Sequence, residues 1–507
     1  MAILERHMNG AILCLDIGTS GLKAGVVDSE LAIRFSNFSK TGIFDNTFDL
    51  DDCLATICKL VSELSVLAKT QHIDICAINV SGQMGGIIGL KRDGMATTPF
   101  DSGVDIESER FNEKLHAILG DSVISTTCGS PRNTAKILRW KEMYPQVYKQ
   151  TDIFLPLHSH ILAKLTQSSP NEIPIDHTML AFFGNEDAKT LSWSKDLTEA
   201  LGLDLEKFPN ICTPCTQIGV LSASIAKNMA LRGGIPVFAG LGDQPAGLAG
   251  ADFMQSEDLF AVLGSTTLLF GGYQDFQPDP NRRIKFIPSI TGDKLYPFTY
   301  INGAGLILPW FTNLTGESTL DDQHLRRLTK EAERIPPGSD NLLLLPYFGG
   351  SQCPYDSHRR GSWHGLSFTH TKAHLFRSIL ESIAYGYASD IHYLQEQLHI
   401  KPESIACTGG GSKNRLWTQI IADCTTLPVQ TQQSYHCTLK GSAIPALVGL
   451  GLKNLPITEH KPDIEASNTP NAARTTLYAP YRSLYEQATT LPSVELNTRL
   501  SKFGYQS

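Results

Sequence analysis

The feature that most constrains the fold is a strand–turn–strand pattern that occurs twice, half a chain apart. Residues 13–28 place a turn rich in Gly, Thr and Ser between two apolar arms, and residues 259–272 do the same. Because glycine adopts turn conformations that other residues resist, each pattern predicts a tight β-hairpin. A repeat at this distance favours a duplicated domain, with each copy opening on a similar hairpin. The alternative is two unrelated glycine-rich hairpins.

The length, net charge and cysteine count of the chain limit the class of protein it can belong to. A chain of 507 residues exceeds the size at which one hydrophobic core stops growing, so we expect two large domains. The net charge of −8 argues against nucleic acid or an anionic membrane as a partner, and no apolar run is long enough to span a bilayer. The eleven cysteines form no disulfide framework, and no signal peptide is visible. We therefore expect a cytoplasmic protein.

The first hairpin has the composition of a phosphate-binding turn. Residues 18–21 offer backbone N–H groups and small hydroxyls, and nothing bulky blocks close approach of a phosphate. Lys23 adds a cation, and Asp16 at the end of the first arm adds a carboxylate suited to Mg²⁺. A buried hairpin needs a turn for structural reasons alone, so this motif is weak evidence when taken by itself.

Periodicity predicts most of the remaining elements. We expect helices at 50–69, 244–251, 374–392, 415–424 and 441–450, and strands at 32–38, 75–80, 87–90 and 342–347. Near the C-terminus the sequence predicts a loop at 468–476 and a last helix at 481–489. Trp140, Trp310 and Trp417 lie on apolar faces and are expected in the core. His158 and His160 have no acidic neighbour in the sequence and are expected to have a structural or surface role.

Four motifs stand in a recognisable order: Asp16-Ile17-Gly18-Thr19 with Lys23, Gly242-Asp243, Gly264-Ser265-Thr266-Thr267, and Thr408-Gly409-Gly410-Gly411-Ser412-Lys413-Asn414. This order and spacing, from about Ile12 to Leu452, resembles the FGGY carbohydrate kinases of the actin, Hsp70 and hexokinase superfamily. The resemblance implies an α/β fold of two ribonuclease-H-like domains with a cleft between them. Residues 1–250 would hold mainly the sugar and the catalytic base, and residues 251–507 mainly the nucleotide.

The same resemblance assigns roles to single residues. Asp243 would be the general base that accepts the proton of a sugar hydroxyl, although an aspartate there also suits a helix N-cap. The implied cofactors are ATP and Mg²⁺, with Asp16 and Asp243 at the metal. The implied nucleotide-binding residues are Gly18, Thr19, Ser20, Gly264, Ser265, Thr266, Gly410, Gly411 and Asn414.

The sugar side departs from the family pattern. Residues 81–86 resemble the Gly-Gln-Met-His-Gly motif of xylulokinases and sedoheptulokinases, which places Gln83 and Met84 on the sugar, but Gly85 stands in place of the His. Asp105 occupies the position of a ketose-binding Asp, with different flanking residues. The room left at Gly85 favours a longer ketose such as sedoheptulose, with D-xylulose and D-ribulose as alternatives.

A second class of function uses the same fold. An actin- or chaperone-like module would bind ATP to drive a partner, without a sugar. Gln83 and Met84, which resemble a sugar motif, favour the kinase. The expected partners are a small sugar and ATP, with neither nucleic acid nor membrane, and a homodimer is left open.

Overall fold

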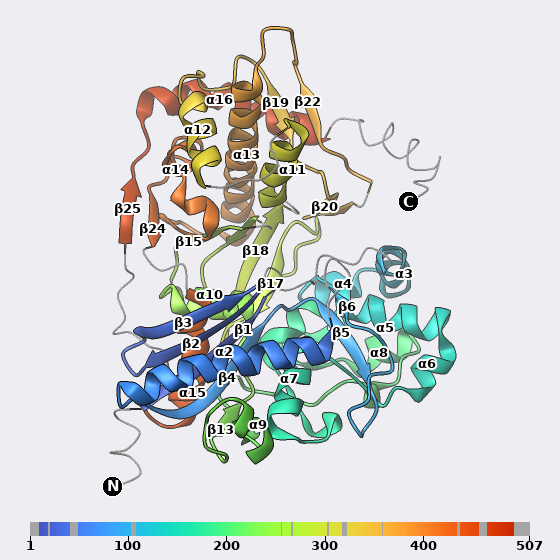
Figure 1. Cartoon of the computed structure of the whole chain (residues 1–507). Helices are drawn as coiled ribbons and strands as arrows, with labels where there is room; N and C mark the ends of the chain where they lie inside the picture. The colour runs from blue at the N-terminus through green and yellow to red at the C-terminus, as the bar shows by residue number, and fades with distance from the viewer. Residues whose placement is uncertain are drawn as a thin grey trace.

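The protein is described by a computed structural model, which covers residues 10–18, 21–40, 49–102, 108–254, 256–264, 267–301, 304–316, 322–356, 358–432, 437–455 and 464–490. Figure 1 shows two bodies, each built around one large sheet. The N-terminal half forms the lower body, and most of the C-terminal half forms the upper body.

The lower body contains a mixed sheet. In spatial order its strands are β12 (Gln217–Val220), β13 (Pro236–Phe238), β4 (Asp74–Gly82), β1 (Gly10–Ile17), β2 (Leu22–Asp28) and β3 (Ile33–Ser39), with β14 (Leu241–Gly242) also paired to β4. Strands β1, β2 and β3 are antiparallel, whereas β4 runs parallel to β1, and β13 and β14 run parallel to β4.

The upper body repeats this order. Its strands are β25 (Ile464–Asn468), β24 (Val429–Gln432), β23 (Ile405–Thr408), β15 (Leu259–Leu263), β16 (Thr267–Phe270), β18 (Leu295–Ile301) and β17 (Lys285–Pro288). Strand β15 pairs antiparallel with β16 and parallel with β23, as β1 does with β2 and β4. Both sheets therefore have the ribonuclease-H-like order 3-2-1-4-5, and the duplication predicted from the two hairpins is confirmed.

Helices cover the sheets, and smaller sheets fill an insertion of the lower body. The lower helices are α2 (Leu50–Thr70), α3 (Glu109–Leu119), α4 (Ser122–Ser125), α5 (Arg132–Met143), α6 (Pro145–Gln150), α7 (Leu157–Thr166), α8 (Lys195–Ala200), α9 (Ala223–Asn228) and α10 (Asp243–Gly250). The later helices are α11 (Ile307–Leu314), α12 (Asp322–Ala332), α13 (Lys372–Leu398), α14 (Arg415–Thr425), α15 (Cys437–Gly449) and α16 (Ala472–Thr490).

Among the described residues, the minor strands form five small sheets. They are β6 (Asp101–Ser102) with β5 (Gly86–Leu90) and β7 (Ile153–Leu155), β8 (Ile175–Asp176) with β11 (Ile211–Cys212), β9 (Glu186–Asp187) with β10 (Ser192–Trp193), β19 (Leu343–Leu345) with β22 (Ser362–His364), and β20 (Ser351–Gln352) with β21 (Tyr355–Asp356).

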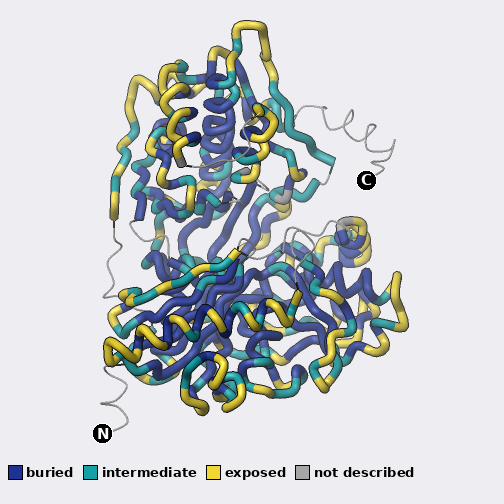
Figure 2. Tube along the Cα trace, in the orientation of Figure 1, coloured by how far each residue is buried: buried dark blue, intermediate teal, exposed yellow. Residues whose placement is uncertain are grey.

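Helix α2 shows why the predicted elements form. The Asp49 carboxylate caps it by accepting from the backbone N–H groups of Asp51 and Asp52, at 2.8 and 3.0 Å. Its apolar face, which includes Ile57, Val61 and Leu64, is buried against the lower sheet. Figure 2 shows this arrangement in both bodies, with buried strands inside and exposed helical turns outside.

Two glycines let helices α10 and α15 cross at close range. A Cβ added to Gly441 would lie 1.8 Å from the Ala246 carbonyl oxygen, and one added to Gly250 would lie 1.9 Å from the Cys437 carbonyl oxygen. Although α15 comes late in the sequence, Leu439 and Ile444 on it are buried in the core beneath the lower sheet. The crossing therefore joins α10, the helix that begins at Asp243, to the second half of the chain.

The C-terminal prediction was wrong. Helix α16 begins at Ala472, inside the predicted loop, and continues through Pro480. Tyr478 and Tyr485 explain this, because both are buried against helix α13 and this packing outweighs the loss of one helical hydrogen bond at the proline.

The tryptophan prediction was right at two of three positions. Trp140 and Trp417 are buried, whereas Trp310 is 40% exposed and packs against Phe348 and Trp363 at the surface. Within the described residues, no helix is both long and apolar enough to span a bilayer.

Candidate active site

Three neighbouring strands of the lower sheet end at the same edge. Ile17 of β1 lies opposite Gly82 of β4, and Gly82 lies opposite Gly242 of β14. Asp16, Gln83 and Asp243, which are far apart in the sequence, are therefore carried to one edge of the sheet. Ligands of α/β sheets bind at the carboxyl ends of parallel strands, so this edge is the candidate active site.

Asp16 is paired on one side and open on the other. It is 3% exposed, and its Oδ2 lies 3.0 Å from Nζ of Lys23, the residue opposite it in the β1–β2 hairpin. Its Oδ1 is buried without a hydrogen-bond partner. Since a buried carboxylate oxygen without a partner is costly, Oδ1 marks a place where a ligand would be stabilised. The negative charge of Asp16 raises the pKa of Lys23.

Asp243 is the first residue of helix α10, and Gly242 takes the N-cap position that was the alternative for this aspartate. Burial, followed by the negative charge of Asp16, raises the pKa of the Asp243 carboxyl to about 7. The backbone N–H of Gln244 and the charge of Lys23 act in the opposite direction. A carboxyl group that titrates near neutral pH is well matched to accept a proton from a hydroxyl group.

The loop after β4 supplies a buried amide. Gln83 is 5% exposed, and neither its Oε1 nor its Nε2 has a hydrogen-bond partner in the described structure. Met84 is also buried, and a Cβ added to Gly242 would lie 2.7 Å from its sulfur. Met84 thus packs behind the backbone that carries Asp243, while Gln83 leaves a donor and an acceptor for a polar ligand.

Sequence reasoning missed a buried chain of polar residues behind Asp243. The backbone N–H of Gly242 donates to Thr178 Oγ1 at 2.9 Å, and the Thr178 hydroxyl donates to Asp176. The other oxygen of Asp176 lies 3.7 Å from Nε2 of His158. His158 and His160 are buried, as expected of structural residues, and Asp176 is the acidic neighbour that sequence distance concealed.

A second missed group surrounds Asp101. The Lys136 ammonium and the Arg139 guanidinium each lie 2.6 Å from a different oxygen of Asp101, and the Trp140 indole N–H donates to it at 3.2 Å. These side chains are buried beside β6. The predicted sugar-binding residue Asp105 lies outside the described residues.

The phosphate turns are described in part. Gly18 donates its N–H to the Gly21 carbonyl oxygen at 3.1 Å, and Gly264 follows β15 directly. The predicted residues Thr19, Ser20, Ser265 and Thr266 lie outside the described residues.

The glycine turn after β23 lies beside the end of β15. Gly409 has a φ of +93°, and a Cβ there would lie 2.7 Å from the Leu263 carbonyl oxygen. At Gly410 an added Cβ would meet nothing within 4 Å, so this backbone is open to a ligand, whereas at Gly411 it would meet the Trp417 ring. Asn414 caps helix α14 by accepting from Trp417 N–H, and its Nδ2 donates to Thr329 Oγ1 at 3.0 Å.

The donor set at the sheet edge fits Mg²⁺. Asp16 and Asp243 are close enough for the charge of one to raise the pKa of the other, and Asp16 has an oxygen without a partner. Mg²⁺ is held in such sites by one or two carboxylates together with water and substrate phosphates. Among the described side chains, no group of three or more His, Cys, Asp and Glu residues forms a metal cage.

Comparison with known proteins agrees with this geometry. The sequence matches the N-terminal domain of the FGGY family of carbohydrate kinases over residues 11–250 and the C-terminal domain of that family over residues 259–450. It is 25% identical over 458 residues to a xylulose kinase of Bacillus subtilis, covering 87% of this chain and 88% of that protein. It is 26% identical over 495 residues to an L-fuculokinase of Escherichia coli, covering 94% of this chain and 97% of that protein.

Solved structures show the same fold. The gluconate kinase of Lactobacillus acidophilus superposes with a TM-score of 0.85 at 22% identity, covering 98% of this chain and all of that one. The xylulose kinase of the same organism gives a TM-score of 0.83 at 23% identity, covering 94% and 97%. With both family domains matched in order across two ribonuclease-H-like bodies, the chain belongs to the FGGY family of carbohydrate kinases, which transfer a phosphoryl group to a sugar hydroxyl.

Proposed function

We propose that this kinase phosphorylates a hydroxyl of a ketose, with Asp243 as general base and Mg-ATP as phosphoryl donor. The observation that carries the proposal is the sheet edge, where a carboxyl group with a pKa of about 7 lies near a buried carboxylate with one oxygen that has no partner and a buried amide that has none. Phosphoryl transfer needs such groups, because its catalysis consists largely of positioning and charge stabilisation.

Asp243 accepts the proton of the attacking hydroxyl. General-base assistance of this kind contributes on the order of 10²–10⁴-fold to the rate. Lys23 holds the Asp16 carboxylate in place, so that Asp16 Oδ1 faces the ligand side. Asp16 and Asp243 would hold Mg²⁺, which neutralises charge on the ATP phosphates when bound.

The turns at Gly18, Gly264 and Gly410 bind the nucleotide. Gly18 and Gly264 follow the equivalent strands β1 and β15, so the proposed phosphate sites approach the cleft from both bodies. The open backbone at Gly410 supports adenosine binding there. Nucleotide binding by Asn414 has less support, because its side chain already accepts from Trp417 N–H and donates to Thr329.

Gln83 binds the sugar, and Met84 packs against Gly242 next to the catalytic aspartate. A ketose substrate is supported by the xylulose kinases among the relatives, while the fuculokinase and gluconate kinase show that related chains act on other sugars. None of the relatives described above is named a sedoheptulokinase. Sedoheptulose is proposed only because Gly85, in place of the family's His, leaves room for a longer ketose. D-xylulose and D-ribulose are the alternatives.

A substrate panel tests the proposal. The purified enzyme is incubated with ATP and Mg²⁺ and with sedoheptulose, xylulose, ribulose, L-fuculose, gluconate or glycerol, and ADP release is measured. We expect release that requires a sugar and is fastest with a ketose. Equal ATP hydrolysis with and without every sugar would instead indicate an ATP-driven binding module.

A further inference from the structure

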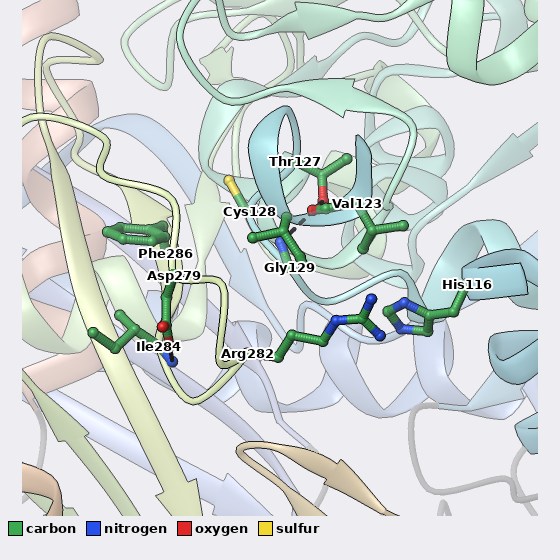
Figure 3. Close-up of a pocket in the computed structure, with 10 residues that line it drawn as sticks. His116, Val123, Thr127, Cys128, Gly129, Asp279, Arg282, Ile284 and Phe286 are labelled. Carbon is green, nitrogen blue, oxygen red and sulfur yellow. Dashed lines mark hydrogen bonds between the residues drawn. The ribbon is translucent and has the colours of Figure 1, made fainter. Parts of the chain in front are cut away.

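Two adjoining pockets lie where the insertion of the lower body meets strand β17 of the upper body. Figure 3 shows the first, in which His116 and Thr127 come from the lower body and Arg282 and Phe286 from the upper. The second shares His116, Gly129 and Arg282 with it and adds Ser130, Arg132 and Lys285. The wall is thus built by both halves of the chain.

The wall is strongly cationic. Lys285 is 6% exposed, and in the described part of the chain no hydrogen bond or ion pair reaches its ammonium group. Its contact there is with the Tyr300 ring, whose centroid lies 5.2 Å from Nζ. The Arg132 guanidinium donates to the Tyr300 hydroxyl at 2.7 Å, and the Arg282 guanidinium points toward the His116 ring in Figure 3.

The carboxylate in the pocket wall forms no ion pair with Lys285 or Arg282 in the described structure. Asp279 accepts from the backbone N–H groups of Asn281, Arg283 and Ile284 and from the Tyr393 hydroxyl, which occupy both of its oxygens. Burial lowers the pKa of Lys285 to about 8, with Cys353 acting in the opposite direction and the charge of Arg132 adding to the decrease. An unpaired buried ammonium is costly, so an anion bound beside Lys285 would be strongly stabilised.

Neutral polar atoms beside the cations also lack partners. Ser130 is fully buried, and its hydroxyl makes no hydrogen bond in the described structure. The same holds for Asn112 Oδ1 and for Nδ1 of His116, and both residues line the second pocket with Ser130. Buried polar groups are normally satisfied, so several orphans around one cationic pocket point to a ligand that completes them.

We propose that this pocket binds the anionic group, carboxylate or phosphate, of a small metabolite. Lys285 supplies the buried charge, Arg282 the outer charge and Ser130 a hydroxyl donor. The pocket is connected to the sugar loop, because Asn133, next to Arg132, donates to the Met84 carbonyl oxygen at 3.1 Å and accepts from Gly86 N–H at 2.9 Å. The anion belongs either to an acidic sugar substrate or to a separate effector.

The test measures binding of two probes, inorganic phosphate and D-gluconate, by calorimetry. The variant Lys285→Met keeps the length of the side chain and removes its charge, and it is expected to fold because it removes an unpaired buried ammonium. Lys294→Met is the matched control, since Lys294 directly precedes the neighbouring strand β18 and pairs with Asp275 outside the pocket. We expect at least one probe to bind wild type and Lys294→Met equally, and Lys285→Met at least tenfold more weakly.

Kinetics then separates the two sources. If gluconate is phosphorylated and its KM rises tenfold in Lys285→Met while the KM of a neutral ketose is unchanged, the anion belongs to the substrate. If phosphate changes the turnover of the ketose in wild type but not in Lys285→Met, the anion that the pocket binds belongs to an effector. The proposal is overturned if neither probe binds wild type, or if Lys285→Met binds both as wild type does. Because binding is measured without turnover, this result is independent of the assigned kinase reaction.

Discussion

The rate of phosphoryl transfer should fall as the pH drops through about 7, because Asp243 must be ionised to accept a proton. Burial and the charge of Asp16 raise the pKa of its carboxyl to about 7, so the neutral form dominates below that pH. One ionisation at this position leaves about a tenth of the plateau rate at pH 6 and about nine-tenths at pH 8. With both substrates well below their KM, the rate reports the free enzyme.

Two substitutions that change the charge beside Asp243 should move the acid limb of the pH–rate profile, where the rate falls with pH, in opposite directions. Lys23→Met removes a positive charge that favours the ionised carboxylate, so the limb moves to higher pH. Asp16→Asn removes a negative charge that opposes ionisation, so the limb moves to lower pH, with a lower plateau if Asp16 holds the metal. The assay is ADP release from pH 5 to 9. A limb below pH 5, or shifts of the same sign in both variants, would refute the assignment of the acid limb to Asp243.

Three further predictions concern residues around the site. Gln83→Ala should raise the KM of the sugar about tenfold with kcat little changed, because one hydrogen bond to the ligand is lost, and an unchanged KM would remove Gln83 from the site. Gly441→Ala should lower the free energy of unfolding by about 1–3 kcal/mol, because its Cβ would meet the α10 backbone. Gly247→Ala, where an added Cβ meets open space, should be neutral or stabilising. A denaturant titration in which Gly247→Ala is the less stable variant would contradict the tight crossing of α10 and α15. Thr178→Val should lower kcat by leaving Gly242 N–H unpaired, and Thr178→Ser should restore it; equal kcat in both variants would make Thr178 merely structural.

The duplication could be predicted because its signals are local, whereas the candidate site residues were assigned from the resemblance to the FGGY kinases. The two hairpins carry their own turn residues, and the pairing of β1 and β14 with β4 then brings the ends of these strands to one edge. The pairing of Lys23 with Asp16 follows from the same hairpin, since the two residues lie directly opposite each other.

The remaining features depend on contacts between distant segments. Asp176 lies in a two-residue strand with no periodicity, and only the fold brings it near His158 and Thr178. Lys285 belongs to no motif of the sequence, and only the packing of β17 against the insertion places it in the pocket wall. The sequence predicted a last helix only over 481–489, but the packing of Tyr478 and Tyr485 keeps one helix from Ala472 through Pro480.

The most direct test of the central claim compares wild type with Asp243→Asn. The substitution preserves shape while removing the base, so we predict that sugar and ATP binding, measured by calorimetry, stay within about threefold. We predict that kcat for sugar-dependent ADP release falls at least 10²-fold. A variant that binds both ligands and retains a near-normal kcat would contradict the account, because Asp243 would then not be the base.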